Sequence, residues 1–110
     1  MAVKPIKMFE GTQLANAAAT LYTAPTGGGV VKISQITVCN TSNSVVHTFS
    51  LSIGTNSSTN ILIDARPLAP LETQSVPEIV GQLLTAGEVL QMFADTASVV
   101  AAQGSGVFIS

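Results

Sequence analysis

Apolar and polar side chains alternate along the middle of the chain with the period of two that is typical of a β-strand. Between Val45 and Ile53 the odd positions carry Val, His, Phe, Leu and Ile, and the even positions carry Val, Thr, Ser and Ser. Successive residues of a strand point to opposite faces of the sheet. This segment is therefore predicted to be a half-buried antiparallel strand with a hydroxyl-lined outer face.

Similar signals recur at intervals of roughly ten residues along the chain. Residues 19–24 and 30–40 are rich in β-branched and aromatic side chains and are bounded by Pro, Gly and Asn. A change of apolar phase between Ile33 and Ile36 indicates a β-bulge or a strand that passes between two layers. Further strands are predicted at residues 61–64, 72–76, 88–95 and 98–103, with a short helical turn within 77–88, and residues 106–110 close the chain.

The segments between these strands carry turn-forming residues. Asn and Ser residues at positions 40–44 suit a hairpin loop between the strands on either side. Pro67 and Pro70 exclude central-strand pairing at their positions, because proline has no backbone N–H to donate.

The length and the strand spacing together predict the architecture. A chain of 110 residues suffices for one hydrophobic core. Short strands separated by turns are typical of an all-β sandwich or jelly roll. We therefore predict one antiparallel, jelly-roll-like β-sandwich at residues 13–110, preceded by an N-terminal arm at residues 1–12.

Charged residues are unusually sparse. They make up only 9% of the chain, against about 25% in an ordinary globular domain. With a net charge of −2, copies of the protein repel one another little. No apolar run approaches the ~20 residues of a membrane helix, and the first residues lack the pattern of a signal peptide. We therefore expect neighbouring molecules in an assembly to cover much of the surface.

The few positive charges are concentrated near the N-terminus. Lys4 and Lys7 are two of the four, whereas the rest of the chain has Lys32 and Arg66 against six acids. One hypothesis is that the arm docks on an acidic neighbour. The alternative is an ordinary frayed terminus, the default for chain ends.

The glycine-rich stretch "TAPTGGGVVK" at residues 23–32 invites comparison with a phosphate-binding loop. Such a loop places Gly-Lys-Ser/Thr directly before a helix. Here two valines separate the glycines from Lys32, and the following residues have a strand pattern. The stretch is therefore predicted to be a turn between strands.

No other constellation in the sequence indicates chemistry. Cys39 and His47 are the only residues of their types, so a disulfide, a cysteine zinc site and a histidine pair are excluded within one chain. The remaining metal option is His47 with Asp64 or Glu72. Four positive charges and no tryptophan argue against nucleic-acid binding. We expect no enzyme activity, no cofactor, no membrane contact and no small-molecule substrate.

The order of segments resembles a pattern found in small structural proteins of tailed bacteriophages. The resemblance covers residues 14–110 and is carried by "LANAAATLYTAP", "VVKISQITVCNTS", "HTFSLSI" and "LLTAGEVLQMFADTASVVAAQGSGV". It implies a β-sandwich virion component without catalytic residues. Similar sandwiches occur on heads, necks and fibres, so the position in the particle stays open at this point.

The resemblance and the sparse charge together favour a capsid decoration, or cement, protein. Such a protein is made in the host cytoplasm and binds the outer surface of the phage head, with the major capsid protein and copies of itself, expected as a homotrimer, as its partners. The alternatives are a neck, tail or fibre-base component, or a receptor- or carbohydrate-binding module. The candidate interface residues are Lys4, Ile6, Lys7, Met8 and Phe9 in the arm, and Arg66, Leu68 and Leu71 in the proline-containing loop.

Overall fold

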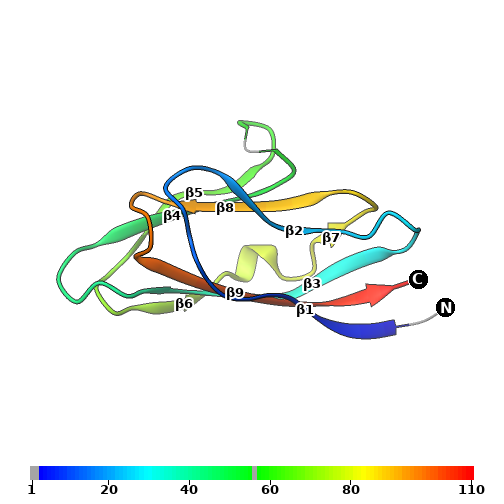
Figure 1. Ribbon diagram of the computed structural model, residues 1–110, viewed down its shortest axis with the longest axis horizontal. Helices are drawn as coiled ribbons and strands as arrows, with labels where there is room; N and C mark the ends of the chain where they lie inside the picture. Colours follow the sequence, from blue (N-terminus) through cyan, green and yellow to red (C-terminus); the bar gives the residue numbers. More distant parts are fainter. Residues whose placement is uncertain (1–2, 56) are drawn as a thin grey trace.

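The computed structural model describes residues 3–55 and 57–110, and within them almost every regular element is a strand (Figure 1). A 3-10 helix, η1 (Pro77–Ile79), is the exception. The strands are β1 (Val3–Gln13), β2 (Ala19–Thr23), β3 (Val30–Asn40), β4 (His47–Ile53), β5 (Ile61–Leu68), β6 (Thr73–Ser75), β7 (Leu83–Leu84), β8 (Val89–Ala94) and β9 (Val100–Ile109). The all-β prediction is confirmed.

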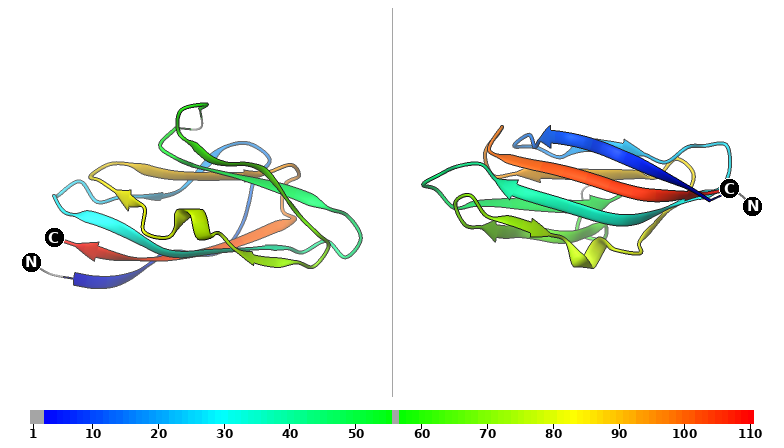
Figure 2. Two further views of the ribbon diagram at one scale, coloured as in Figure 1. Left: turned by 180° about the vertical axis from the view of Figure 1, so that it is seen from behind. Right: turned by 90° about the horizontal axis from the view of Figure 1, so that it is seen from below.

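The strands form two antiparallel sheets that pack face to face (Figure 2). One sheet, here called the β3 sheet, has the order β1-β9-β3-β6, with β7 also paired to β3. The other, the β4 sheet, has the order β2-β8-β4-β5. If β6 and β7 are taken as one interrupted strand, this order is that of an eight-stranded jelly roll, with two Greek keys folded over each other.

The interruption between β6 and β7 coincides with a bulge in β3. The register between β3 and β9 shifts between Ile33 and Gln35, which confirms the bulge predicted from the change of apolar phase. The chain leaves β3 after β6, forms η1, and returns where the Ile33 N–H donates to the Gln82 carbonyl at 2.9 Å. The two short strands β6 and β7 thus pair with one edge of β3, on either side of its bulge.

The core lies between the two sheets and is filled by the inward residues of their central strands. Phe49 and Leu51 of β4 face Ile33 and Ile36 of β3, and all four are at most 1% exposed. The predicted inward face of this strand is present at His47, Phe49 and Leu51, which are all buried. Its outer face differs from the prediction, because Ser50 and Ser52 are also buried and bond to neighbouring backbone.

One predicted connection and one predicted strand end are wrong. Residues 40–44 do not form a hairpin loop, because β3 and β4 belong to different sheets. The loop instead crosses from one layer to the other, an arrangement that residue preferences alone do not distinguish from a hairpin. The strand predicted at residues 98–103 does not end there but continues as β9 to Ile109, since Gly104 and Gly106 stay within the β3 sheet.

The first residues of the chain form the edge strand β1. β1 pairs with β9 in antiparallel register from Val3↔Ile109 to Gln13↔Ala101, with irregularities around Met8 and Phe9. Both of these side chains are buried in the core, at 6% and 8% exposure. The segment predicted as an arm is hydrogen-bonded to the sandwich along the described part of its length.

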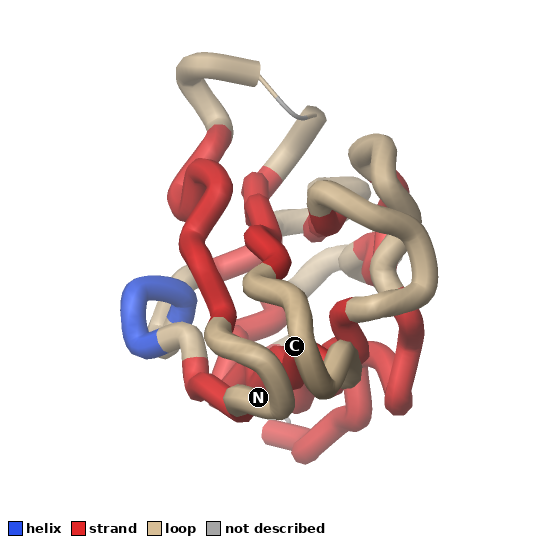
Figure 3. Tube along the Cα trace, turned by 90° about the vertical axis from the view of Figure 1, so that its left-hand side faces the viewer, coloured by secondary structure: helices blue, strands red, loops and turns tan. Residues whose placement is uncertain are grey.

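The sandwich is elongated, with extents of 48 × 26 × 20 Å. At one end, here called the terminal end, β1 begins and β9 finishes close together (Figure 1). At the opposite end, here called the arch end, the loops 41–46 and 69–72 cross from one sheet to the other. Figure 3 looks onto the arch end and shows η1 at one side of the sandwich.

Candidate interaction surfaces

The eight candidate interface residues lie in two separate parts of the sandwich. Five are on strand β1, and the other three are on strand β5 or in the loop that follows it. Strand β1 lies at the edge of the β3 sheet, and β5 lies at the edge of the β4 sheet. Met8, Phe9 and Leu68 are buried, and Ile6 packs partly against the core. The exposed members are Lys4, Lys7 and Leu71, and the two groups do not form one surface.

Arg66 is engaged within the molecule. Its guanidinium forms a two-pronged ion pair with Glu78, which links edge strand β5 to η1. The hydrogen bonds of this pair raise the pKa of Arg66 and lower that of Glu78. The ion pair therefore holds η1, which lies between β6 and β7 of the β3 sheet, against β5 of the β4 sheet.

An apolar face covers the terminal end of the β3 sheet on its outer side. Cross-strand register places its residues in two rows: Val3, Ile109 and Val30, then Pro5, Val107, Lys32 and Leu83. Their chain neighbours Val31 and Leu84 are fully buried, so Lys32 and Leu83 must point outward. Val3 and Leu83 are 63% and 51% exposed. Contiguous exposed apolar side chains are typical of contact surfaces.

Nearer the arch end, the same outer face becomes polar and hollowed. A depression of about 350 Å³ lies across β1, β9 and β3. Its polar lining consists of Lys7, Glu10, Gln35, Thr37, Gln103 and Ser105. Lys7 and Glu10 are 3.4 Å apart and mostly exposed, so their ion pair is weak and exchanges readily with a partner's charges. We call this region the polar depression.

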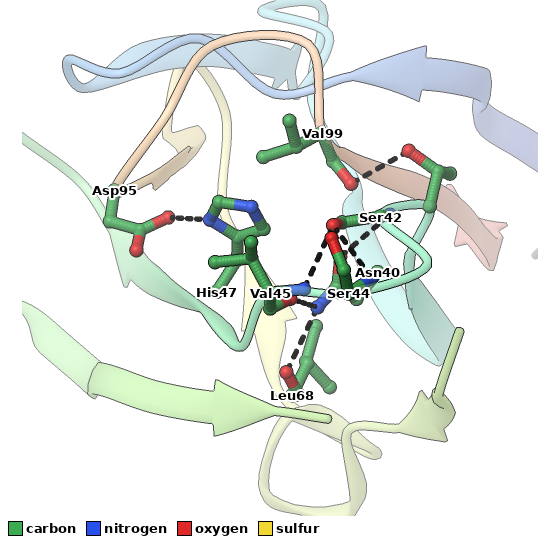
Figure 4. Close-up of polar contacts among 9 residues, drawn as sticks. Asn40, Ser42, Ser44, Val45, His47, Leu68, Asp95 and Val99 are labelled. Carbon is green, nitrogen blue, oxygen red and sulfur yellow. Dashed lines mark hydrogen bonds and ion pairs between the residues drawn. The ribbon is translucent and has the colours of Figure 1, made fainter. Parts of the chain in front are cut away.

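At the arch end, one buried side chain organises the crossing loop (Figure 4). The Asn40 amide donates to the carbonyls of Val45 (2.9 Å) and Leu68 (3.0 Å), and its oxygen accepts from the Ser42 N–H (3.0 Å). Asn40 is completely buried, so each of these bonds replaces one that water cannot supply. The loop between the layers is thereby held in one conformation.

The loops at this end present a second exposed apolar cluster. Val45, Val46 and Leu71 are 50%, 54% and 64% exposed. The Leu71 N–H donates to the Ser42 carbonyl at 3.0 Å, and the Val45 N–H donates to the Ser42 hydroxyl at 3.1 Å, so one residue ties both loops together. We call these three side chains the arch patch.

His47 pairs with Asp95, and not with Asp64 or Glu72, the two acids of the metal option left open by the sequence. The His47 Nδ1 lies 2.9 Å from the Asp95 carboxylate, and the imidazole is 10% exposed (Figure 4). The bond joins the start of β4 to the loop after β8. In residues 3–55 and 57–110, no three His, Cys, Asp or Glu side chains are grouped so as to hold a metal ion.

Sequence reasoning identified Leu71 but missed the rest of the arch patch and the apolar face. Val45 was expected to point into the core as part of a strand, whereas the strand begins at His47. The apolar face combines residues from four strands, and only cross-strand register shows that they are neighbours. Among the described residues, no helix is long and apolar enough to cross a membrane.

The fold is shared with a chain in structures of infectious bursal disease virus. Over 98% of its length the chain matches the Gx strain structure with a TM-score of 0.50 and 17% identity, and over 97% it matches the Gt strain structure with a TM-score of 0.50 and 13% identity. Each match spans 32% of the viral chain. Both neighbours come from this virus and not from a tailed phage. No protein-family model and no curated protein matches the sequence.

Proposed function

We propose that the protein is a structural component of a virus particle, and specifically a decoration protein that binds the outer surface of a tailed-phage head. The observation that carries the proposal is a jelly roll with very few charges, 9% of the residues, whose fold is shared with a chain of a virus structure. Jelly rolls are common in viral capsids. A sparsely charged surface is favourable where neighbours cover it.

The contact with the major capsid protein is proposed at the polar depression and the adjoining part of β1. Amide and hydroxyl groups from β3 and β9 line the depression, and Lys7 supplies a positive charge at its rim. Such a face forms hydrogen bonds with a shell surface without burying an uncompensated charge. An acidic shell surface suits Lys7, because its bond to Glu10 is exposed and weak.

In the proposed mechanism, binding of the protein is coupled to the stability of the assembled shell, and no catalytic step is involved. A protein that binds only the assembled shell stabilises it by mass action, and the effect grows with the free concentration of the protein. Each bound copy bridges neighbouring shell subunits, so the shell must lose these contacts before it opens. A rigid sandwich suits this role because little conformational entropy is lost on binding.

Binding to particles that lack the protein tests the proposal. We expect purified protein to bind such particles and to raise the temperature at which they open. Gln103→Glu places a negative charge in the polar depression and should weaken binding about tenfold, or about 1.4 kcal/mol. Thr20→Glu makes a similar change at an exposed position of the β4 sheet and serves as the control.

Two results would contradict this proposal. If the wild-type protein leaves particle stability unchanged, the decoration role is wrong. If Gln103→Glu and Thr20→Glu bind equally well, the shell contact lies elsewhere. The copy number per particle separates the alternatives, since a number comparable with that of the major shell subunit indicates the head and a handful indicates a neck, tail or fibre base.

A further inference from the structure

Leu71 combines two features that are unfavourable in an isolated molecule. Its backbone φ is +63°, in the left-handed region where a bulky side chain is strained and where Gly or Asn is preferred. Its side chain is also 64% exposed to water. The turn at residues 69–72 imposes this φ, because Leu71 follows Pro70 and the Glu72 N–H donates to the Ala69 carbonyl at 3.0 Å. A contact that buries Leu71 would remove the cost of exposing its side chain to water.

The rest of the arch patch is rigidly presented. Val45 and Val46 lie on the crossing loop that Asn40 and Ser42 hold in place. The turn at residues 69–72, which carries Leu71, is closed by the Glu72 carboxylate, which accepts from the Ala69 N–H at 2.7 Å. A preorganised patch loses less conformational freedom on binding than a mobile one.

The arch patch is flanked by negative charge. Glu72 follows Leu71 directly, and its hydrogen bonds from Gln74 and Ala69 lower its pKa, so it is ionised at neutral pH. Asp95 lies at the same end, beside His47. Neither carboxylate pairs with a Lys or Arg among the described residues.

The apolar face at the terminal end has the opposite charge. Lys32 stands in its second row, beside Leu83, whereas Lys4 on strand β1 pairs with the core-facing Phe108 and so points to the opposite face of the sheet. Neither lysine forms an ion pair within residues 3–55 and 57–110. The molecule thus carries an apolar patch with acids at one end and an apolar face with one lysine at the other. Two arch patches facing each other would instead bring like charges together.

We infer that the arch patch of one copy docks on the apolar face of the next, with Leu71 as its apolar anchor. The inference rests on the proposed function only in taking copies of the chain to be neighbours in an assembly. The contact joins two different surfaces, so it repeats from copy to copy, and a rotation that closes after three copies gives the trimer expected from the sequence. Glu72 and Asp95 then face Lys32 across the contact.

Measurement of molar mass against concentration, by sedimentation equilibrium, tests the contact. We expect the wild-type mass to rise with concentration and the association constant to fall as salt is added. Leu71→Asn should weaken association about tenfold. The same variant should raise the thermal unfolding midpoint of the monomer, because Asn tolerates a positive φ. Leu62→Asn, at an exposed leucine outside both surfaces, is the matched control and should associate as the wild type does.

A charge exchange tests the pairing of the two surfaces. Val46→Lys puts a cation in the arch patch, opposite Lys32, and should weaken association. Lys32→Glu in the same chain should then restore part of it, whereas Lys32→Glu alone should weaken it.

The outcomes are distinct from those of the particle experiment. A wild-type protein that binds particles but stays monomeric at every concentration overturns this inference and leaves the proposed function standing. Equal association of Leu71→Asn and Leu62→Asn, or no recovery in the double variant, also overturns it. Self-association without particle binding supports the contact between copies and contradicts the decoration role.

Discussion

Two glycines of β9 allow β1 to pack closely on the core. A Cβ atom on Gly104 would lie 2.7 Å from the Phe9 Cζ, and one on Gly106 would lie 2.7 Å from the Lys32 carbonyl oxygen and 3.1 Å from the Met8 sulfur. The missing side chains leave room for two large residues of the neighbouring strand. At these positions close approach, rather than a turn, explains the glycine.

We therefore predict that Gly104→Ala destabilises the protein by about 1–3 kcal/mol, because the added methyl group overpacks the site beneath the Phe9 ring. Gly27→Ala is the control, since a Cβ there meets no atom within 4 Å and Gly27 is not among the positive-φ residues. Urea unfolding measures both changes. Equal stability of the two variants would show that Phe9 moves aside without cost.

At the scale of elements, the most consequential strand is β1. Its sequence carries Lys4 and Lys7 among apolar residues, and that mixture is equally typical of an edge strand and of a docking arm. The structure shows β1 paired with β9, with Met8 and Phe9 buried against the core. Lys4 and Lys7 stay exposed, and lysines on an edge strand hinder pairing with another sheet.

This arrangement predicts that β1 contributes to folding and not only to binding. Phe9→Ala should lower the free energy of unfolding by about 3–5 kcal/mol, because it removes a buried ring and leaves a cavity. Lys7→Ala on the same strand should change it by less than about 0.5 kcal/mol, because the side chain is exposed. Denaturant unfolding gives both values. A small effect of Phe9→Ala would mean that residues 3–13 detach easily from the sandwich.

At the scale of the whole molecule, the scarce charges support the connections between strands. Glu78 bonds to Arg66 between η1 and β5, Glu72 closes the turn at residues 69–72, and Glu88 accepts from the Thr85 N–H in the turn before β8. These hydrogen bonds lower the pKa of each carboxylate. Three of the six acids thus stabilise turns or the link between η1 and β5.

The lowered pKa values predict a loss of stability in acid. A carboxylate whose folded-state pKa lies below its ordinary value of 4.5 stabilises the fold at higher pH. That contribution disappears as the pH falls from 4.5 through the lowered value. The temperature of the thermal unfolding midpoint, measured between pH 7 and pH 3, should fall once the pH is below about 4.5. The Glu88→Gln variant should be less stable than the wild type at pH 7, and its unfolding midpoint should fall less steeply as the pH is lowered. An identical pH dependence of the two proteins would show that the Glu88 carboxylate does not contribute this stability.

Local pattern predicts much of this fold. The bounds of β3, the bulge after Ile33 and the turn at residues 24–29 follow from side-chain periodicity and from proline and glycine chemistry, all of which act within a few residues. The positive φ of Gly28 and Gly29 agrees with the predicted turn. For the site, the sequence indicated Lys7 and Leu71 but placed Met8, Phe9 and Leu68 with them, because an apolar residue looks alike in a core and in an interface.

The sequence by itself determined the class of the fold and its sparse charge, because periodicity and composition are properties of the chain alone. Only the tertiary structure decided which sheet each strand joins, and therefore that residues 40–44 cross between layers. It also decided that Val3, Val30, Leu83 and Ile109 share one face while Leu71 stands at the opposite end. Such surfaces depend on pairing between residues distant in sequence, and that pairing is set by the packing of the whole core.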